Sequence, residues 1–194
     1  MLENMLSELF SVPTKHLDFK HLDLKSIEEY CLSKTETSLT YSNEGGYHSN
    51  FFDLKNDKVL HPLCTEILSA SKQFCDELDV KRVTQIQNMW SILNKYSHYN
   101  REHIHPNSFF SGVFYPGENY PNDCGALSFV NPAFKEMGYD WDDTQINFNK
   151  HNSLVMNIKP QRGMCLIFPS YISHFVYVNR NKDIDRLVIS FNLK

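Results

Sequence analysis

The chain has 194 residues, of which 41% are hydrophobic and 13% aromatic, and it carries a formal net charge of −4 at pH 7. This composition is that of a globular protein with a sizeable core and excludes a disordered chain. The negative charge argues against nucleic-acid binding, which usually requires a basic face. No apolar run is long enough to cross a membrane, and the first ten residues lack the basic start and long apolar centre of a signal peptide. We therefore expect neither a membrane nor a nucleic-acid partner.

The cysteines indicate a reducing compartment. Their number is odd, they are scattered, and no Cys-x-x-Cys pair occurs among them: Cys31, Cys64, Cys75, Cys124 and Cys165. Each lies in an apolar or mixed sequence context that suits a packed thiol. We therefore predict a cytoplasmic protein without disulfides and without a cysteine metal site.

The first 80 residues are predicted to form a helical front piece with an intervening loop. Asp23 can cap a first helix, whose apolar face consists of Leu24, Ile27 and Cys31. Pro62 suits the first turn of a second helix, whose apolar face consists of Leu63, Ile67, Phe74 and Leu78. Between them, Lys34–Gly46 is polar and is predicted to be a loop. His48 follows this loop, and we interpret it as a surface residue rather than a substrate contact.

Residues 81–194 are predicted to form a β core, because from Val83 onward apolar residues recur with a period of two. The expected strands are centred on residues 86–92, 109–115, 127–129, 154–158, 164–168, 174–178 and 187–193. Several short strands separated by turns indicate a sandwich or barrel rather than a parallel α/β sheet. Asn131–Asn152 interrupts the pattern, and we predict a long loop or flap there. No repeat or linker divides the chain, so residues 1–194 are expected to form a single domain.

A His-x-His pair, His103 and His105, stands just before the strand predicted at residues 109–115. Residues two apart in a strand share a face, so both imidazoles could point to one place. Neutral imidazole is the commonest protein ligand of first-row transition metals, although paired histidines also occur on ordinary surface strands. A third histidine, His174, begins another predicted strand. If it faces the pair across a barrel, the three would hold a metal and leave coordination positions open.

On the last predicted strand, Arg186 and Ser190 share the face opposite the apolar Leu187. If this face lines the barrel, the guanidinium needs a partner, because burying an unpaired charge is costly. A carboxylate ligand would satisfy it through charge-assisted hydrogen bonds. The alternative is that Arg186 pairs at the rim with a nearby acid, Asp183 or Asp185.

Together these motifs form an ordered set: His103-x-His105-Pro106, Ser111-Gly112-Val113-Phe114-Tyr115, Gly125-x-Leu127-x-Phe129, Gly163-x-x-x-x-Phe168-Pro169-Ser170, His174 and Arg186-x-x-x-Ser190-Phe191-Asn192. From about Asn88 to the C-terminus, this order resembles the 2-oxoglutarate- and Fe(II)-dependent oxygenases of the kind common in marine bacteria and their phages. The resemblance implies a double-stranded β-helix, a jelly-roll, cupin-like barrel, in agreement with the strand pattern. It also implies the cytoplasm of a bacterium or of an infected host cell.

The resemblance further implies an Fe(II) site whose metal ligands and catalytic residues are His103, His105 and His174. The cosubstrate would be 2-oxoglutarate, and Arg186 would pair with its far carboxylate, helped by Ser190. Tyr115 would be a further hydrogen-bond donor to that carboxylate. Dioxygen would be consumed, 2-oxoglutarate would be decarboxylated to succinate, and an unidentified small-molecule or peptidyl substrate would be hydroxylated.

One position departs from the family pattern, in which a His is followed two residues later by Asp or Glu. His105 occupies that position here, and if His105 is taken as the first ligand, the corresponding position is Asn107. Glu102 would point to the opposite face of an ideal strand from His103. The site is therefore either a three-His centre or a two-His centre completed by water.

Three functional hypotheses follow from the sequence. The first is a 2-oxoglutarate-dependent hydroxylase, in which Asn88, Trp90 and Asn94 line the pocket floor, although Trp90 suits ordinary barrel core equally well. The second is a cupin-like metal protein that isomerises or binds a small molecule without 2-oxoglutarate, and the inward Arg186 with Ser190 argues against it. The third is a non-catalytic jelly-roll binding protein whose histidines hold no metal. An aromatic-rich jelly roll of this kind could also pair as a homodimer.

Overall fold

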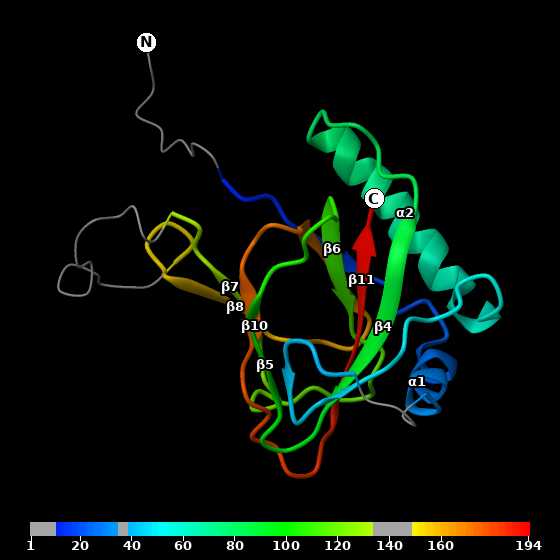
Figure 1. The fold of residues 1–194 in the computed structure, drawn as a ribbon, viewed down its shortest axis with the longest axis vertical. Coiled ribbons are helices and arrows are strands. Elements are labelled where there is room, and N and C mark those ends of the chain that lie inside the picture. Colours follow the sequence, from blue (N-terminus) through cyan, green and yellow to red (C-terminus); the bar gives the residue numbers. More distant parts are fainter. Residues whose placement is uncertain (1–10, 35–38, 134–148) are drawn as a thin grey trace.

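Two antiparallel β-sheets face each other in the computed structural model, which describes residues 11–34, 39–133 and 149–194 (Figure 1). The larger sheet has six strands, in the order β1 (Lys15–Asp18), β9 (Met164–Pro169), β6 (Phe110–Phe114), β11 (Arg186–Leu193), β4 (Ile86–Asn94) and β3 (Tyr47–His48). The smaller sheet has five, in the order β2 (Asn43–Glu44), β5 (Tyr99–His103), β10 (His174–Val176), β7 (Leu127–Val130) and β8 (Val155–Ile158). From β4 onward the chain crosses between the sheets at almost every connection. This path is that of a jelly roll and confirms the predicted double-stranded β-helix.

Two helices lie on the outer side of the larger sheet, away from β5 and β10 (Figure 1). The first, α1 (Leu24–Leu32), begins where predicted, because the Asp23 side chain accepts a hydrogen bond from a backbone N–H of the first turn. The second, α2 (His61–Glu77), follows a 3-10 turn, η1 (Lys58–Leu60), and has Pro62 in its first turn. The two predicted helices are therefore confirmed.

Strand β11 is buried along its whole length, and its two faces contribute to different cores. Leu187 and Ile189 pack in a cluster with the two helices, whereas Val188 belongs to a second cluster between the sheets. Arg186 and Ser190 share the face of Val188 and line the cavity between the sheets. The predicted alternation is thus confirmed, and it places a guanidinium in the protein interior.

The front part of the chain also contributes three short strands that the sequence pattern does not reveal. Strands β1 and β3 form the two edges of the larger sheet by pairing with β9 and β4, and β2 pairs with β5 in the smaller sheet. The segment predicted as a loop, Lys34–Gly46, thus includes β2. Strands of two to four residues are too short to show a period, and pairing with neighbouring strands defines them.

The flap predicted at Asn131–Asn152 falls largely outside the described part of the chain, which omits residues 134–148. The strands on either side of this segment, β7 and β8, pair with each other. Within the described ranges, no helix combines the length and the apolar character needed to cross a bilayer.

Candidate active site

A cavity of about 590 Å³ lies between the two sheets and is lined from both of them. Cavities of this size accommodate small-molecule ligands and cofactors. Its polar lining includes an imidazole cluster next to the smaller sheet and an arginine on the larger sheet.

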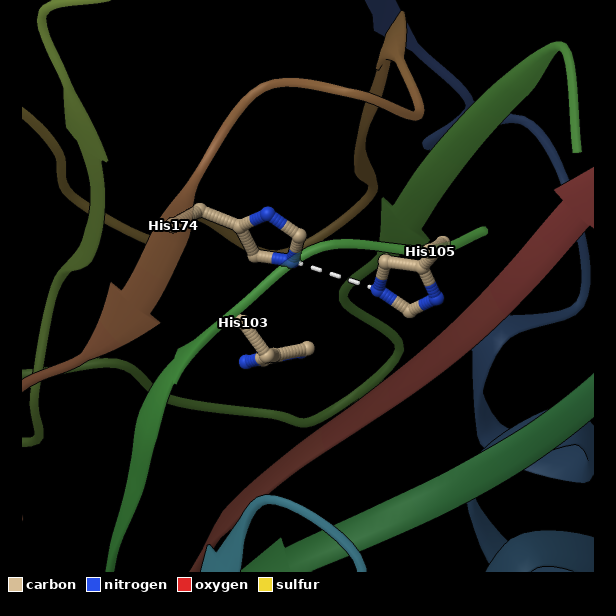
Figure 2. A group of neighbouring side chains, drawn as sticks. All are labelled: His103, His105 and His174. Carbon is tan, nitrogen blue, oxygen red and sulfur yellow. Dashed lines mark hydrogen bonds between the residues drawn. The ribbon is translucent and has the colours of Figure 1, made fainter. Parts of the chain in front are cut away.

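Three imidazoles meet at the wall of this cavity (Figure 2). His103 ends β5 and His174 begins β10, and these two residues pair directly across the strands. His105 lies two residues beyond β5, where its backbone N–H donates to the Ser170 carbonyl at 3.0 Å. One nitrogen of each ring lies within 4.8 Å of the corresponding nitrogen of the other two. The fold thus brings together the three histidines that are far apart in the sequence.

Backbone carbonyls hold two of these rings in a defined tautomer. His103 Nδ1 lies 2.6 Å from the Arg101 carbonyl oxygen, and His174 Nδ1 lies 2.9 Å from that of Ile172. A carbonyl can only accept, so each Nδ1 carries the proton and each Nε2 keeps a lone pair. His105 Nε2 lies 3.2 Å from His174 Nε2, and the two rings are stacked with centroids 5.1 Å apart. Carbonyl-anchored imidazoles that converge through Nε2 are typical of metal ligands.

Burial keeps these imidazoles uncharged near neutral pH. Desolvation lowers the pKa of His103, that of His105 to about 4 and that of His174 to about 3. Uncharged nitrogen donors at this spacing fit a transition metal. Two ligand atoms at right angles, each about 2.1 Å from an ion, are about 3 Å apart, close to the 3.2 Å between His105 Nε2 and His174 Nε2.

No carboxylate of the described residues joins this cluster. Glu102 is exposed and accepts a hydrogen bond from Ser173 Oγ at 2.5 Å. Asn107 is also exposed, in a left-handed backbone conformation with φ 64°. The cluster therefore offers three neutral nitrogen donors and no anionic one.

Arg186 is the largest fully buried side chain of the cavity, with 1% of its surface exposed. Its Nε donates to the Gly125 carbonyl at 2.9 Å and its Nη2 to the Tyr115 hydroxyl at 3.0 Å. Its Nη1 has no hydrogen-bond partner among the described residues. Asp183 and Asp185 form no ion pair with Arg186, so the alternative of a pair at the rim is wrong. A buried cation with an unpaired N–H fits an anionic ligand such as a carboxylate.

Tyr115 and Ser190 differ in how they relate to Arg186. Burial raises the pKa of Tyr115, so its hydroxyl stays protonated and, while accepting from Arg186, can still donate. Ser190 lies four residues along β11, about 13 Å from Arg186 between Cα atoms at the usual rise of a strand, and pairs across the sheet with Trp90. Tyr115 thus contacts the guanidinium, whereas Ser190 faces a different part of the cavity.

The structure also reveals a cavity residue that the sequence interpretation placed on the surface. His48 is 4% exposed and stacks on Trp90, with ring centroids 5.5 Å apart and an angle of 11° between the planes. Trp90 in turn lies 5.9 Å from the ring of His105. The surface interpretation of His48 is therefore wrong. Strand β3 has only two residues, and no period in the sequence could have shown which way His48 points.

Residues 88–192 match the family described as "Putative 2OG-Fe(II) oxygenase". This span is more than half of the chain and contains the three histidines, Tyr115, Arg186 and Ser190. Among curated proteins no match to the sequence was found.

Solved structures share the fold at low sequence identity. A prolyl-4-hydroxylase from Pseudomonas putida aligns with a TM-score of 0.70 and 11% identity over 95% of this chain and 93% of its own. A viral collagen prolyl hydroxylase from Paramecium Bursaria Chlorella virus-1, solved with 2-oxoglutarate, has a TM-score of 0.58 and 11% identity over 93% and 94%. HygX from Streptomyces hygroscopicus, solved with nickel and 2-oxoglutarate, has a TM-score of 0.60 and 10% identity over 94% and 82%. These likenesses agree with the family match, and the chain belongs to the 2OG-Fe(II) oxygenases.

Proposed function

We propose that the protein is a dioxygenase that binds Fe(II) through His103, His105 and His174 and uses 2-oxoglutarate to hydroxylate its substrate. One observation carries this proposal: three uncharged, converging imidazoles and a buried arginine with a free N–H line the same cavity. The family match supports the metal and the cosubstrate. The three-His ligand set distinguishes this chain from the usual pattern of two histidines and a carboxylate.

The protein's own residues bind and orient the cosubstrate. Arg186 Nη1 is free to donate to the far carboxylate of 2-oxoglutarate, and the Tyr115 hydroxyl can donate to the same group. The Gly125 carbonyl fixes the guanidinium plane through Nε. Gly125 has φ +92°, and a Cβ there would lie 2.3 Å from the Tyr177 carbonyl oxygen, so a larger residue would displace this anchor.

The apolar walls of the cavity exclude water from the reacting groups. Side chains of both sheets form this lining, including Val113, Leu127, Phe168, Val176 and Val188. When bound, Fe(II) and 2-oxoglutarate supply the oxidising chemistry, in which dioxygen is consumed and 2-oxoglutarate is decarboxylated to succinate. The protein itself holds the reacting groups in position and keeps water out of the site.

The decisive experiment is an anaerobic titration of the Fe(II)-loaded protein with 2-oxoglutarate. We expect the visible charge-transfer band of a 2-oxoglutarate chelate to appear and saturate. His174→Ala should lose bound iron and the band, because it removes a buried donor, whereas His16→Ala, at an exposed position on β1, should keep both. Iron binding without the band would favour the cupin-like alternative, to which a three-His metal also belongs. If the protein binds no iron, the hypothesis of a non-catalytic binding protein is the one that remains.

A second variant tests the cosubstrate site. Arg186→Ala should weaken 2-oxoglutarate binding by ~2–5 kcal/mol, because the far carboxylate loses its buried partner. Arg180→Ala, at an exposed position, is the matched control and should bind normally. Unchanged 2-oxoglutarate affinity in Arg186→Ala would show that the cosubstrate binds elsewhere.

We infer that the unidentified substrate is a small molecule or a peptidyl residue and that the protein works in the cytoplasm of a bacterium or of an infected host cell. The free, scattered cysteines support a reducing compartment, and the resemblance of the motif order supports the bacterial or phage setting and the substrate class. A homodimer also stays a prediction, which sedimentation analysis can test.

A further inference from the structure

A row of polar side chains lines the cavity next to the imidazole cluster and has no part in holding metal or 2-oxoglutarate in the function proposed above. Asn88 and Trp90 lie on β4, and Ser190 and Asn192 lie on β11. They face each other in register, with Asn88 paired to Asn192 and Trp90 to Ser190. Trp90 lies 5.9 Å from the ring of His105, so the row adjoins the place where a substrate would react.

Two atoms of this row are buried without a protein partner. Trp90 is 6% exposed, and its indole Nε1–H has no acceptor among the described residues. Asn88 Oδ1 is likewise buried and has no donor. Buried polar groups are nearly always hydrogen-bonded, so an orphan donor and an orphan acceptor side by side in a cavity indicate a ligand that supplies the opposite groups.

A chain of hydrogen bonds orients the Asn192 side chain so that its NH₂ group can donate into the cavity. The Ser111 hydroxyl donates to Asn192 Oδ1 at 2.8 Å and lies 2.7 Å from the Ser170 hydroxyl, which can donate to it. The Asn192 side-chain oxygen is thereby occupied, and its NH₂ group is left for the cavity. The row thus presents two N–H donors, Trp90 and Asn192, and one carbonyl acceptor, Asn88.

The charged side chains near this part of the cavity already have hydrogen-bonding partners. Arg101 Nε donates to Glu44 Oε1 at 2.9 Å, and Glu102 accepts from Ser173. Burial lowers the pKa of His48, which stacks on Trp90 and stays uncharged near neutral pH. Among the described residues the polar row itself carries no charge, and Arg186, the buried cation of the cavity, lies beyond Val188 on β11. An uncharged substrate group therefore suits the row.

We propose that the polar row recognises an uncharged substrate through a planar amide group. The amide C=O accepts from Trp90 Nε1–H and Asn192 NH₂, and the amide N–H donates to Asn88 Oδ1. Residues two apart in a strand have Cα atoms about 6.6 Å apart, and an amide with a hydrogen bond at each end spans roughly 6–8 Å. The half-exposed rings of Tyr41 and Phe51, which also line the cavity, pack against the rest of the substrate. This inference rests on the proposed function for the statement that the bound molecule is a substrate.

Indole NMR tests the proposal directly, because the chain has only two tryptophans, Trp90 and Trp141. Full-length protein carrying ¹⁵N-labelled tryptophan is loaded with Zn(II) and 2-oxoglutarate, and Trp90→Phe assigns the Trp90 signal. N-methylacetamide is the probe, and we expect a saturable shift of the Trp90 Nε1–H resonance. Methyl acetate has the same shape without the N–H, and it should bind about tenfold more weakly because Asn88 Oδ1 stays unpaired.

Variants on the two faces of β4 complete the test. Asn88→Leu should remove the preference for the amide over the ester, whereas Gln87→Leu, an exposed position on the opposite face, should retain it. If glycerol shifts the Trp90 resonance and saturates at a lower concentration than N-methylacetamide does, the proposed amide group is wrong and the site favours a polyol. If acetate binds more strongly than N-methylacetamide, the proposal that the substrate group is uncharged is wrong. A Trp90 signal that no probe moves would show that only water occupies these atoms.

Zinc content measured on the same samples separates this inference from the proposed function. An amide shift in protein that binds neither zinc nor 2-oxoglutarate would refute the metalloenzyme and leave an amide-binding site. Zinc- and 2-oxoglutarate-loaded protein without an amide shift would refute the amide site alone.

Discussion

His105 differs from the other two cluster histidines in how its ring is held. His103 and His174 each donate Nδ1–H to the carbonyl two residues earlier. No such bond from His105 is found among the described residues, and its ring is instead placed by stacking on His174 and by contact with Trp90. Because it depends least on a fixed hydrogen bond, His105 is, of the three proposed ligands, the one whose position should best tolerate a different donor.

We therefore predict that His105→Asp keeps or tightens Fe(II) binding. A carboxylate at this position would restore the two-His-one-carboxylate set and add an attractive charge to the proposed site, whose other candidate ligands are neutral. Anaerobic equilibrium dialysis with iron analysis measures the dissociation constant. Complete loss of iron in His105→Asp, with iron retained by the wild type, would show that His105 does not occupy the carboxylate position.

A second residue-scale prediction concerns pH. Burial lowers the pKa of His48 below its usual 6.5, so the unfolded chain takes up a proton there at a higher pH than the folded protein does. As the pH falls through about 6.5, protonation favours the unfolded state, and the stability that neutral His48 contributes is lost. His48→Phe keeps a ring against Trp90 and cannot titrate.

Denaturant unfolding of both proteins from about pH 7.5 to about pH 5 measures this effect. The free energy of unfolding of the wild type should fall relative to that of His48→Phe over this range. The cluster histidines are common to both proteins, so their titration cancels in the difference. Parallel curves would contradict a buried, uncharged His48.

At the scale of elements, β6 is an enclosed central strand of the larger sheet. It lies between β9 and β11, and all its residues are buried. At Gly112, an added Cβ would lie 2.2 Å from Phe191 Cζ and 2.6 Å from the Leu166 carbonyl oxygen. The Phe191 ring could rotate, but the carbonyl belongs to the neighbouring strand and cannot move without breaking the sheet.

Gly112→Ala should therefore destabilise the protein by about 1–3 kcal/mol, the usual cost of overpacking a core. Urea unfolding measures the change as a lower midpoint. An unchanged m-value would show that the denatured state is unaffected and that the loss belongs to the folded sheet. A midpoint equal to that of the wild type would mean that β6 and β9 can separate more easily than the structure indicates.

The elements that could be predicted from the sequence are those with a long enough apolar pattern. Strands β4, β6, β9 and β11 alternate over five to nine residues, and Asp23 and Pro62 mark the helix starts. Strands β1, β2 and β3 have two to four residues, and only their partners define them. The burial of His48 depends on β3 and could not be predicted for the same reason.

At the scale of the whole molecule, metal binding is coupled to the folded state. The cluster requires β5 and β10 to be paired, with His103 opposite His174, and the unfolded chain offers no such arrangement. A ligand that binds only the folded state stabilises it by about 2.7 kcal/mol when present at about a hundred times its Kd.

Thermal unfolding with and without added metal tests this coupling. Zn(II), or Fe(II) under argon, should raise the midpoint by roughly 5–10 °C for a chain of this size. His174→Ala should show no rise, and His16→Ala should behave as the wild type. An unchanged midpoint in the wild type would support a barrel that holds no metal.

The parts of the site that could be predicted are residues whose chemistry is unusual for their place in the chain. Three histidines at strand ends and an arginine on an inward face stand out against an apolar pattern. The sequence placed Asn88, Trp90 and Ser190 in the pocket, but only the structure shows that Asn88 Oδ1 and Trp90 Nε1 lack partners and that Asn192 lies beside Asn88. Hydrogen-bond satisfaction belongs to the three-dimensional structure and leaves no trace in sequence spacing.

The imidazole cluster adjoins the smaller sheet, whereas Arg186 belongs to the larger one and Tyr115 directly follows strand β6 of that sheet. In the proposed function, 2-oxoglutarate would be held at one end by a metal next to the smaller sheet and at the other end by Arg186 of the larger sheet. A ligand held in this way connects the two sheets, so we expect its dissociation to be faster in variants whose sheets pack less firmly.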